Sequence, residues 1–234
     1  MPLSGDSTVL VPVDVSTDET PATDLLAFSA GVDVVLLGHY LVPEQAVPAR
    51  VRADEERDAR RRIDAVAEAV DREVTTLVVF THDTDETVDR VADEHGCDAV
   101  LSPGSHDATD RVFVPLRGDD NLDRILSLVA DLLETNDATA TLFHATDAGG
   151  REQGERLVGD AVDQLAADGI QRRRLDGRVV ETDDPVGAIV EAARSFDLLV
   201  VGETDPSLTE RVLGRVPTRI TDEVDRPAFV VRNM

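Results

Sequence analysis

The same order of strand-like and helix-like segments occurs twice along the chain, and this repetition limits the fold more than any other feature of the sequence. Three short motifs return in order, 103, 105 and 99 residues later: Val11-Pro12-Val13-Asp14 as Val114-Pro115-Leu116-Arg117, Leu37-Gly38-His39 as Leu142-Phe143-His144, and Asp98-Ala99-Val100-Leu101 as Asp197-Leu198-Leu199-Val200. Near-equal offsets of this kind predict two copies of one module. We expect a first domain over residues 1–108 and a second over residues 109–234.

Short apolar runs rich in valine and leucine alternate with amphipathic segments, which is typical of a parallel sheet covered by helices. Strands are expected over Thr8–Val15, Asp33–Leu41, Val74–Thr81, Asp98–Ser102, Arg111–Leu116, Ala138–Ala145, part of Ile170–Glu181, Asp197–Val201 and Ala228–Arg232. Helices are expected over Ala53–Asp71, Thr84–His95, Arg151–Asp168 and about Pro217–Val224, and from Asn121 and Asp184-Pro185. The pattern predicts an α/β fold with two open parallel-sheet domains, the first lacking the last helix and strand.

The charge composition excludes several classes of function. The 23 basic residues are all arginine against 48 acidic residues, which gives a net charge of −25. Such a chain repels polyanions, so we expect no nucleic-acid binding. No stretch approaches ~18 consecutive apolar residues, so we expect no insertion into a membrane. The absence of lysine excludes a Walker A loop and Schiff-base chemistry, and the single cysteine excludes a disulfide framework. No signal peptide is apparent, and we expect a soluble cytoplasmic protein.

The acidic surplus also indicates a salty environment. Self-repulsion of this size opposes a compact fold at low ionic strength, whereas at ~1 M salt the Debye length is only about 3 Å. Together with the 3% aromatic content, this composition resembles that of proteins from salt-accumulating archaea.

Motifs at the strand ends resemble those of the universal stress protein family in its tandem form. They are Val11-Pro12-Val13-Asp14, His39-Tyr40, His144-Ala145, Asp197-Leu198-Leu199-Val200-Val201-Gly202 and Pro227-Ala228-Phe229-Val230-Val231. The resemblance covers nearly the whole chain. It implies the five-stranded open α/β fold of the family, related to the adenine-nucleotide α-hydrolases, and a homodimer through the last strand, residues 228–232.

Many members of that family hold ATP at the carboxyl ends of the strands, where glycine-rich backbone and helix amino termini favour phosphate. The family's phosphate loop is only half present here. Gly202 matches its first glycine, Asp205 replaces its second, and Gly214 matches its third one residue early. Arg215 replaces the hydroxyl residue that follows the third glycine in the family, and Thr218 is the nearest hydroxyl.

The adenosine end of the expected pocket is divided between the two copies. The aspartate that contacts the nucleoside in the family is Asp14 in the first copy, whereas Arg117 takes its place in the second. Ala145 and its neighbours would surround the base. Arg117 and Arg215 could instead receive a smaller anion such as AMP or phosphate, because arginine binds such groups bidentately. A structural reading also stands, in which Gly202 turns the chain and Gly214 ends a helix.

Three functional hypotheses follow. The first is a stress-associated binding or regulatory module with a degenerate nucleotide site and no enzymatic activity, since no catalytic motif is present. The second is a working ATP or AMP switch, or a slow ATPase, with Gly202, Gly214 and Thr218 around the phosphates. The third is a stand-alone regulatory domain of a transporter. No metal site is expected, and His39 and His144, at corresponding strand ends, are expected to have packing or hydrogen-bonding roles.

Overall fold

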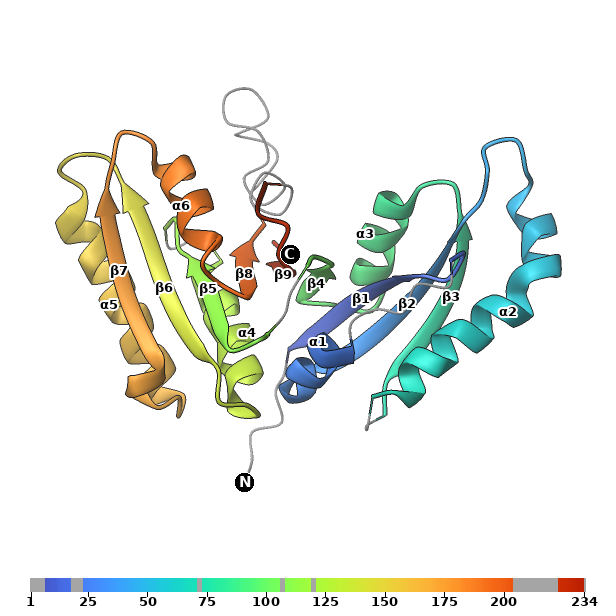
Figure 1. Ribbon diagram of the computed structural model, residues 1–234, viewed down its shortest axis with the longest axis horizontal. Coiled ribbons are helices and arrows are strands. Elements are labelled where there is room, and N and C mark those ends of the chain that lie inside the picture. Colours follow the sequence, from blue (N-terminus) through green and yellow to red (C-terminus); the bar gives the residue numbers. More distant parts are fainter. Residues whose placement is uncertain are drawn as a thin grey trace. The chain divides into compact units, whose positions relative to one another are not determined.

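The computed structural model describes residues 7–17, 23–70, 73–105, 108–118, 121–203 and 223–233, and the structural statements below concern these residues. The chain divides into two compact units, Met1–Leu101 and Ser102–Met234. Each unit is an α/β structure with parallel strands (Figure 1). The predicted fold class is confirmed.

The first unit is a parallel sheet with the strand order β3-β2-β1-β4. Its elements are β1 (Thr8–Asp14), α1 (Thr23–Phe28), the 3-10 helix η1 (Ser29–Gly31), β2 (Asp33–Leu41), α2 (Pro48–Glu68), β3 (Thr75–Thr81), α3 (Thr84–Glu94) and β4 (Ala99–Ser102). Helices α2 and α3 cover opposite faces: a Cβ on Gly38 would lie 3.5 Å from Ile63 of α2, whereas Leu37 packs with Val91 of α3. The sequence did not predict α1 and η1.

The second unit has the strand order β9-β8-β5-β6-β7. Its elements are β5 (Arg111–Pro115), α4 (Leu122–Glu134), β6 (Thr139–Thr146), α5 (Arg151–Ala167), η2 (Arg172–Arg174), β7 (Leu175–Glu181), α6 (Pro185–Ala193), β8 (Leu198–Gly202) and β9 (Ala228–Val231). The core beneath α6 contains Phe113, whose ring contacts the rings of Phe143 and Phe196. The helix expected at about residues 217–224 lies almost wholly outside the described residues.

The two units share a hydrogen-bond arrangement between their first and fourth strands. The Asp98 carboxylate accepts the backbone N–H of Thr8 at 2.9 Å, and Asp98 donates its own N–H to the Thr8 carbonyl at 2.8 Å. Asp197 and Arg111 repeat both bonds at 3.0 Å. Arg111 is therefore the counterpart of Thr8, and by the same spacing Arg117 is the counterpart of Asp14.

The strand register corrects the equivalence proposed for the two histidines. Thr8 is paired with Asp33 and Arg111 with Thr139, so counting along the second strands makes Gly38 the counterpart of His144. Ala145 is then the counterpart of His39. A shift of one residue moves a side chain to the other face of a sheet. The predicted correspondence of His39 and His144 is wrong, because the two rings lie on opposite faces.

The units divide at residues 101 and 102, a few residues before the boundary that the sequence suggests. The segment that follows β4 packs on the start of β9. Ser105 donates its N–H to the Asp225 carbonyl at 3.2 Å, and a Cβ on Gly104 would lie 2.3 Å from the carbonyl carbon of Arg226. This close approach requires glycine at position 104.

Candidate functional site

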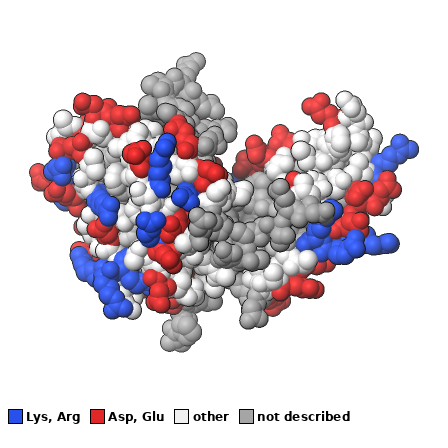
Figure 2. Space-filling view, viewed as in Figure 1, with Lys and Arg blue, Asp and Glu red and all other residues white. Residues whose placement is uncertain are grey.

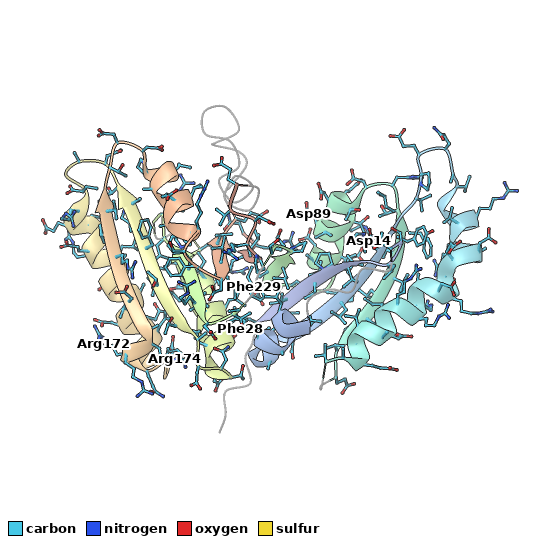
Figure 3. The ribbon with its side chains drawn as sticks, viewed as in Figure 1. Asp14, Phe28, Asp89, Arg172, Arg174 and Phe229 are labelled. Atoms are coloured by element: carbon cyan, nitrogen blue, oxygen red, sulfur yellow. The ribbon has the colours of Figure 1, made fainter. Side chains whose placement is uncertain are left out.

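The carboxyl edge of the first unit brings Asp14 and His39 together. They are register partners at the ends of β1 and β2, so their side chains leave the same face of the sheet. Figure 3 labels Asp14, the last residue of β1. Its Oδ1 accepts the backbone N–H of Ser16 at 2.8 Å and the Ser16 hydroxyl at 2.6 Å. These bonds fix the carboxylate in a tight turn just beyond the strand.

The His39 ring is partly removed from water. Burial lowers the pKa of His39 below its usual value, and the nearby Asp14 carboxylate opposes that shift only partly. Nδ1 is buried and has no hydrogen-bond partner among the described residues. The site therefore combines a fixed carboxylate with an imidazole that is neutral at physiological pH.

Helix α3 begins at the carboxyl edge of the first unit and α6 at the carboxyl edge of the second. An aspartate just before each helix caps it. Asp83 accepts the N–H of Glu86 at 3.0 Å, and Asp184 accepts that of Gly187 at 3.0 Å. An aspartate so placed satisfies one of the first N–H groups of a helix and places negative charge beside the others. These two helix starts are therefore poor places for an anion.

The carboxyl edge of the second unit brings together Arg117, Ala145 and Gly202. Pairing of β5 with β6 and β8 places the ends of these strands side by side. The Arg117 side chain is exposed, and no partner is recorded for it among the residues that the structure describes. Gly202 lies against α4, where a Cβ would be 2.9 Å from Cδ1 of Ile125. A glycine at position 202 therefore allows β8 to pack closely against α4 without any ligand.

Glu203, directly after Gly202, is held by the end of the chain. It donates its N–H to the Val231 carbonyl at 2.7 Å, and its Oε2 accepts the N–H of Asn233 at 3.0 Å. Asn233 returns a side-chain bond to the Glu203 carbonyl at 2.8 Å. A carboxylate therefore stands immediately after the one glycine of the loop that the structure describes.

A second group of contacts at this edge escaped the sequence analysis. Glu181 accepts the Gly149 N–H at 2.9 Å and the Arg151 guanidinium at 3.0 Å. The Gly149 N–H, followed by Arg151, lowers the pKa of Glu181. The contact ties the loop after β6 to the end of β7. No local signal predicts it, because it depends on a backbone N–H in a loop more than thirty residues away.

His144 has a structural role on the opposite face. Its Nδ1 donates to the Leu116 carbonyl at 2.8 Å, and the ring packs on α5, where a Cβ on Gly154 would lie 2.6 Å from Cδ2. Both the packing and the hydrogen-bonding role expected for this histidine are present. The ring takes no part in the edge formed by Arg117, Ala145 and Gly202.

The sequence was compared with models of known protein families. The model of the universal stress protein family matches residues 108–232, which is more than half of the chain. The chain belongs to the universal stress protein family. The family prediction is confirmed. No curated protein sequence matches the chain significantly.

Solved structures of universal stress proteins share this fold. One from Archaeoglobus fulgidus DSM 4304 is 14% identical with a TM-score of 0.65, covering 98% of this chain and 99% of its own. A putative member from Pseudomonas aeruginosa UCBPP-PA14 is 14% identical with a TM-score of 0.56, over 96% and 92% of the two chains. At these identities the likeness shows the fold.

An A. fulgidus universal stress protein in complex with dAMP is also similar. It is 16% identical, with a TM-score of 0.41, over 53% of this chain and 98% of its own. The dAMP is the ligand of that protein.

The phosphate-loop residues Gly214, Arg215 and Thr218 lie outside the described residues, as does Asp205. The positions that the structure brings together are therefore Asp14 with His39 in one unit, and Arg117, Ala145 and Gly202 in the other. Within the described ranges no group of three acidic, histidine or cysteine side chains is arranged to hold a metal ion. None of the described helices has the length and apolar character needed to cross a membrane.

Proposed function

We propose that this universal stress protein is a non-enzymatic binding or regulatory module, built from two tandem copies of the family domain, whose nucleotide site is degenerate. The observation that carries the proposal is the equivalence of Asp14 and Arg117, fixed by the repeated bonds of Asp98 with Thr8 and of Asp197 with Arg111. The resemblance assigns an aspartate here to the nucleoside. The second unit, which retains half of the phosphate loop, has an arginine there.

The surroundings of Gly202 support the same proposal. Glu203 places a carboxylate directly after this glycine and is fixed there by Asn233. A carboxylate near a triphosphate adds repulsion between like charges. The close approach of Gly202 to Ile125 gives the glycine a packing role that needs no ligand. The first unit keeps Asp14, but the residues that the structure describes in this unit include no fifth strand and no phosphate loop.

Equilibrium dialysis against ATP, ADP and AMP in molar potassium chloride tests this proposal. We expect no saturable binding of ATP or ADP in the micromolar range. Saturable ATP binding that is lost in Gly214→Asp but kept in Gly159→Asp would overturn the proposal in favour of a nucleotide switch. Gly159 is the matched control because it lies in α5, where an added Cβ would meet nothing within 4 Å.

A small anion at Arg117 is the second candidate, favoured by the exposure of this side chain and by its lack of a recorded partner in the described chain. An arginine without an intramolecular partner keeps its donors available to a phosphate. AMP binding in the same dialysis, abolished in Arg117→Gln and retained in Arg57→Gln, would support it. Arg57 is a similarly exposed arginine on α2. Absence of AMP binding removes this candidate.

The proposal further includes a cytoplasmic location, a salt-accumulating source and a homodimer through residues 228–232. A dimer through this strand must accommodate the bond between Ser105 and Asp225 at its start. Light scattering in high salt decides the assembly: a mass of two chains is expected, and a strictly monomeric mass contradicts it.

A further inference from the structure

A groove of about 400 Å³ opens on the α6 face of the second unit, near the amino ends of β6 and β7. This is the end of the sheet opposite the carboxyl edge. Helix α6 has nine residues and packs mainly on β6, so β7 is left largely uncovered on this side. Thr141, Phe143 and Phe196, all less than a tenth exposed, form the floor.

Arginines dominate the wall of this groove. Arg111, Arg173, Arg174 and Arg178 line it, with Asp176 as the one acidic residue of the lining. The lining of the groove is therefore positively charged, whereas the whole chain has a net charge of −25. Figure 3 labels Arg174 and its neighbour Arg172 at the start of β7, and Figure 2 shows blue side chains gathered over the same corner of the unit.

Two of these guanidinium groups are neutralised within the protein. Arg111 binds Asp197 through Nη2 at 3.0 Å, and Asp110 also acts on it. Arg178 binds Asp176 at 2.7 Å. These ion pairs give Arg111 and Arg178 a structural role that needs no ligand.

The other two arginines form no ion pair with any residue that the structure describes. Arg174 donates to the carbonyls of Ala138 at 2.8 Å and Leu133 at 3.0 Å, which carry no formal charge. Arg173 is exposed and has no recorded partner in the described chain. Two uncompensated positive charges match a phosphate monoester, which carries about −1.5 to −2 at neutral pH.

The size of the groove points to more than a phosphate ion. Its volume lies within the range of about 300–1,000 Å³ that is usual for small-molecule sites. Leu175 and Ala192 supply apolar wall beside the arginines. We propose that this groove binds a small organic phosphate monoester, with Arg173 and Arg174 on the phosphate and the apolar wall against the organic group.

Calorimetric titration with phenyl phosphate in molar potassium chloride tests the site, because screening then removes the long-range repulsion by the acidic chain. We expect saturable binding that weakens by about tenfold or more in Arg173→Gln, as the loss of a charged hydrogen bond predicts. Arg172→Gln is the matched control, because Arg172 is the adjacent arginine, pairs with Asp163 and does not line this groove.

Each result of the titration either supports or contradicts the site. Unchanged binding in Arg172→Gln together with weakened binding in Arg173→Gln supports the site. Absence of saturable binding, or an equal loss in both variants, overturns it. Inorganic phosphate binding as tightly as phenyl phosphate overturns the role of the organic group. Phenyl phosphate binding that is lost in Arg117→Gln but kept in Arg173→Gln would place the ligand at the carboxyl edge of the sheet and would also overturn the site.

Discussion

At the scale of single residues, the two units differ most at one equivalent position. Asp14 in the first unit is fixed by Ser16 and lies beside a His39 ring whose pKa is lowered. Arg117 in the second unit is exposed, and its neighbour across the edge is Ala145. The same backbone thus presents a carboxylate and an imidazole in one unit and a guanidinium in the other. The two units therefore cannot hold the same ligand in the same way.

His39 should make stability depend on pH. Its folded pKa is lowered from 6.5, so the unfolded chain binds a proton more readily. The contribution of neutral His39 to the free energy of unfolding is therefore fully present above the unfolded pKa of 6.5. It is lost as the pH falls from there toward the folded pKa. Between about pH 8 and about pH 5, the urea midpoint of the wild type should fall further than that of His39→Gln.

The control for this comparison is His95→Gln, which removes an exposed histidine. It should keep the pH dependence of the wild type. Parallel profiles for wild type and His39→Gln, measured by circular dichroism in high salt, would show that the burial of His39 has no energetic effect.

Local motifs identified some of these residues and missed others for a physical reason. Asp14 and Arg117 follow a strand pattern that is intact in both units, so counting along the sequence aligned them. His39 and His144 were misaligned because the loops before β2 and β6 differ in length, and only the pairing of strands fixes the register. The bond from Gly149 to Glu181 needs the folded loop and had no signal in the sequence.

At the scale of elements, the structure repeats the same device at the start of two helices. Thr81 accepts the N–H of Asp83 at 3.0 Å, and Thr182 accepts that of Asp184 at 3.2 Å. Each aspartate then caps its helix. The long helices and strands were predictable from periodicity. The six-residue α1 was not, because fewer than two helical turns give too little periodicity to recognise.

Helix α5 offers a matched pair of glycine substitutions. Gly154→Ala places a Cβ 2.6 Å from the His144 ring, which its bond to Leu116 holds in place. We expect this overpacking to lower the free energy of unfolding by about 1–3 kcal/mol. Gly159→Ala meets open space and should raise it by about 0.5–1 kcal/mol. Urea unfolding of both variants measures the difference, and equal effects would show that His144 yields freely.

At the scale of the whole molecule, charge dominates. The net charge of −25 opposes a compact fold unless salt screens it. Most ion pairs within the described residues are exposed, such as Arg61 with Asp58. Exposed pairs contribute little to stability, typically about 0–1 kcal/mol. Salt in the solvent, more than pairing within the protein, should therefore govern stability.

Potassium chloride should stabilise the chain steeply at first and then level off. The Debye length falls from about 10 Å at ~0.1 M to about 3 Å at ~1 M, so most of the repulsion between carboxylates is screened by then. Thermal midpoints across this range measure the effect. A midpoint that does not change below ~1 M and rises only above it would indicate exclusion of salt from the surface instead of screening.

The composition excluded several classes of function, and the alternation of elements predicted the fold class, both from the sequence alone. The groove bounded by Arg173 and Arg174 was not predictable, because it arises where a short α6 leaves β7 uncovered. The most direct test of the degenerate nucleotide site remains ATP dialysis against the unaltered chain in high salt. We expect the chain to retain no more ATP than a non-binding solute. Saturable uptake of about one ATP per chain that Gly214→Asp abolishes would contradict it.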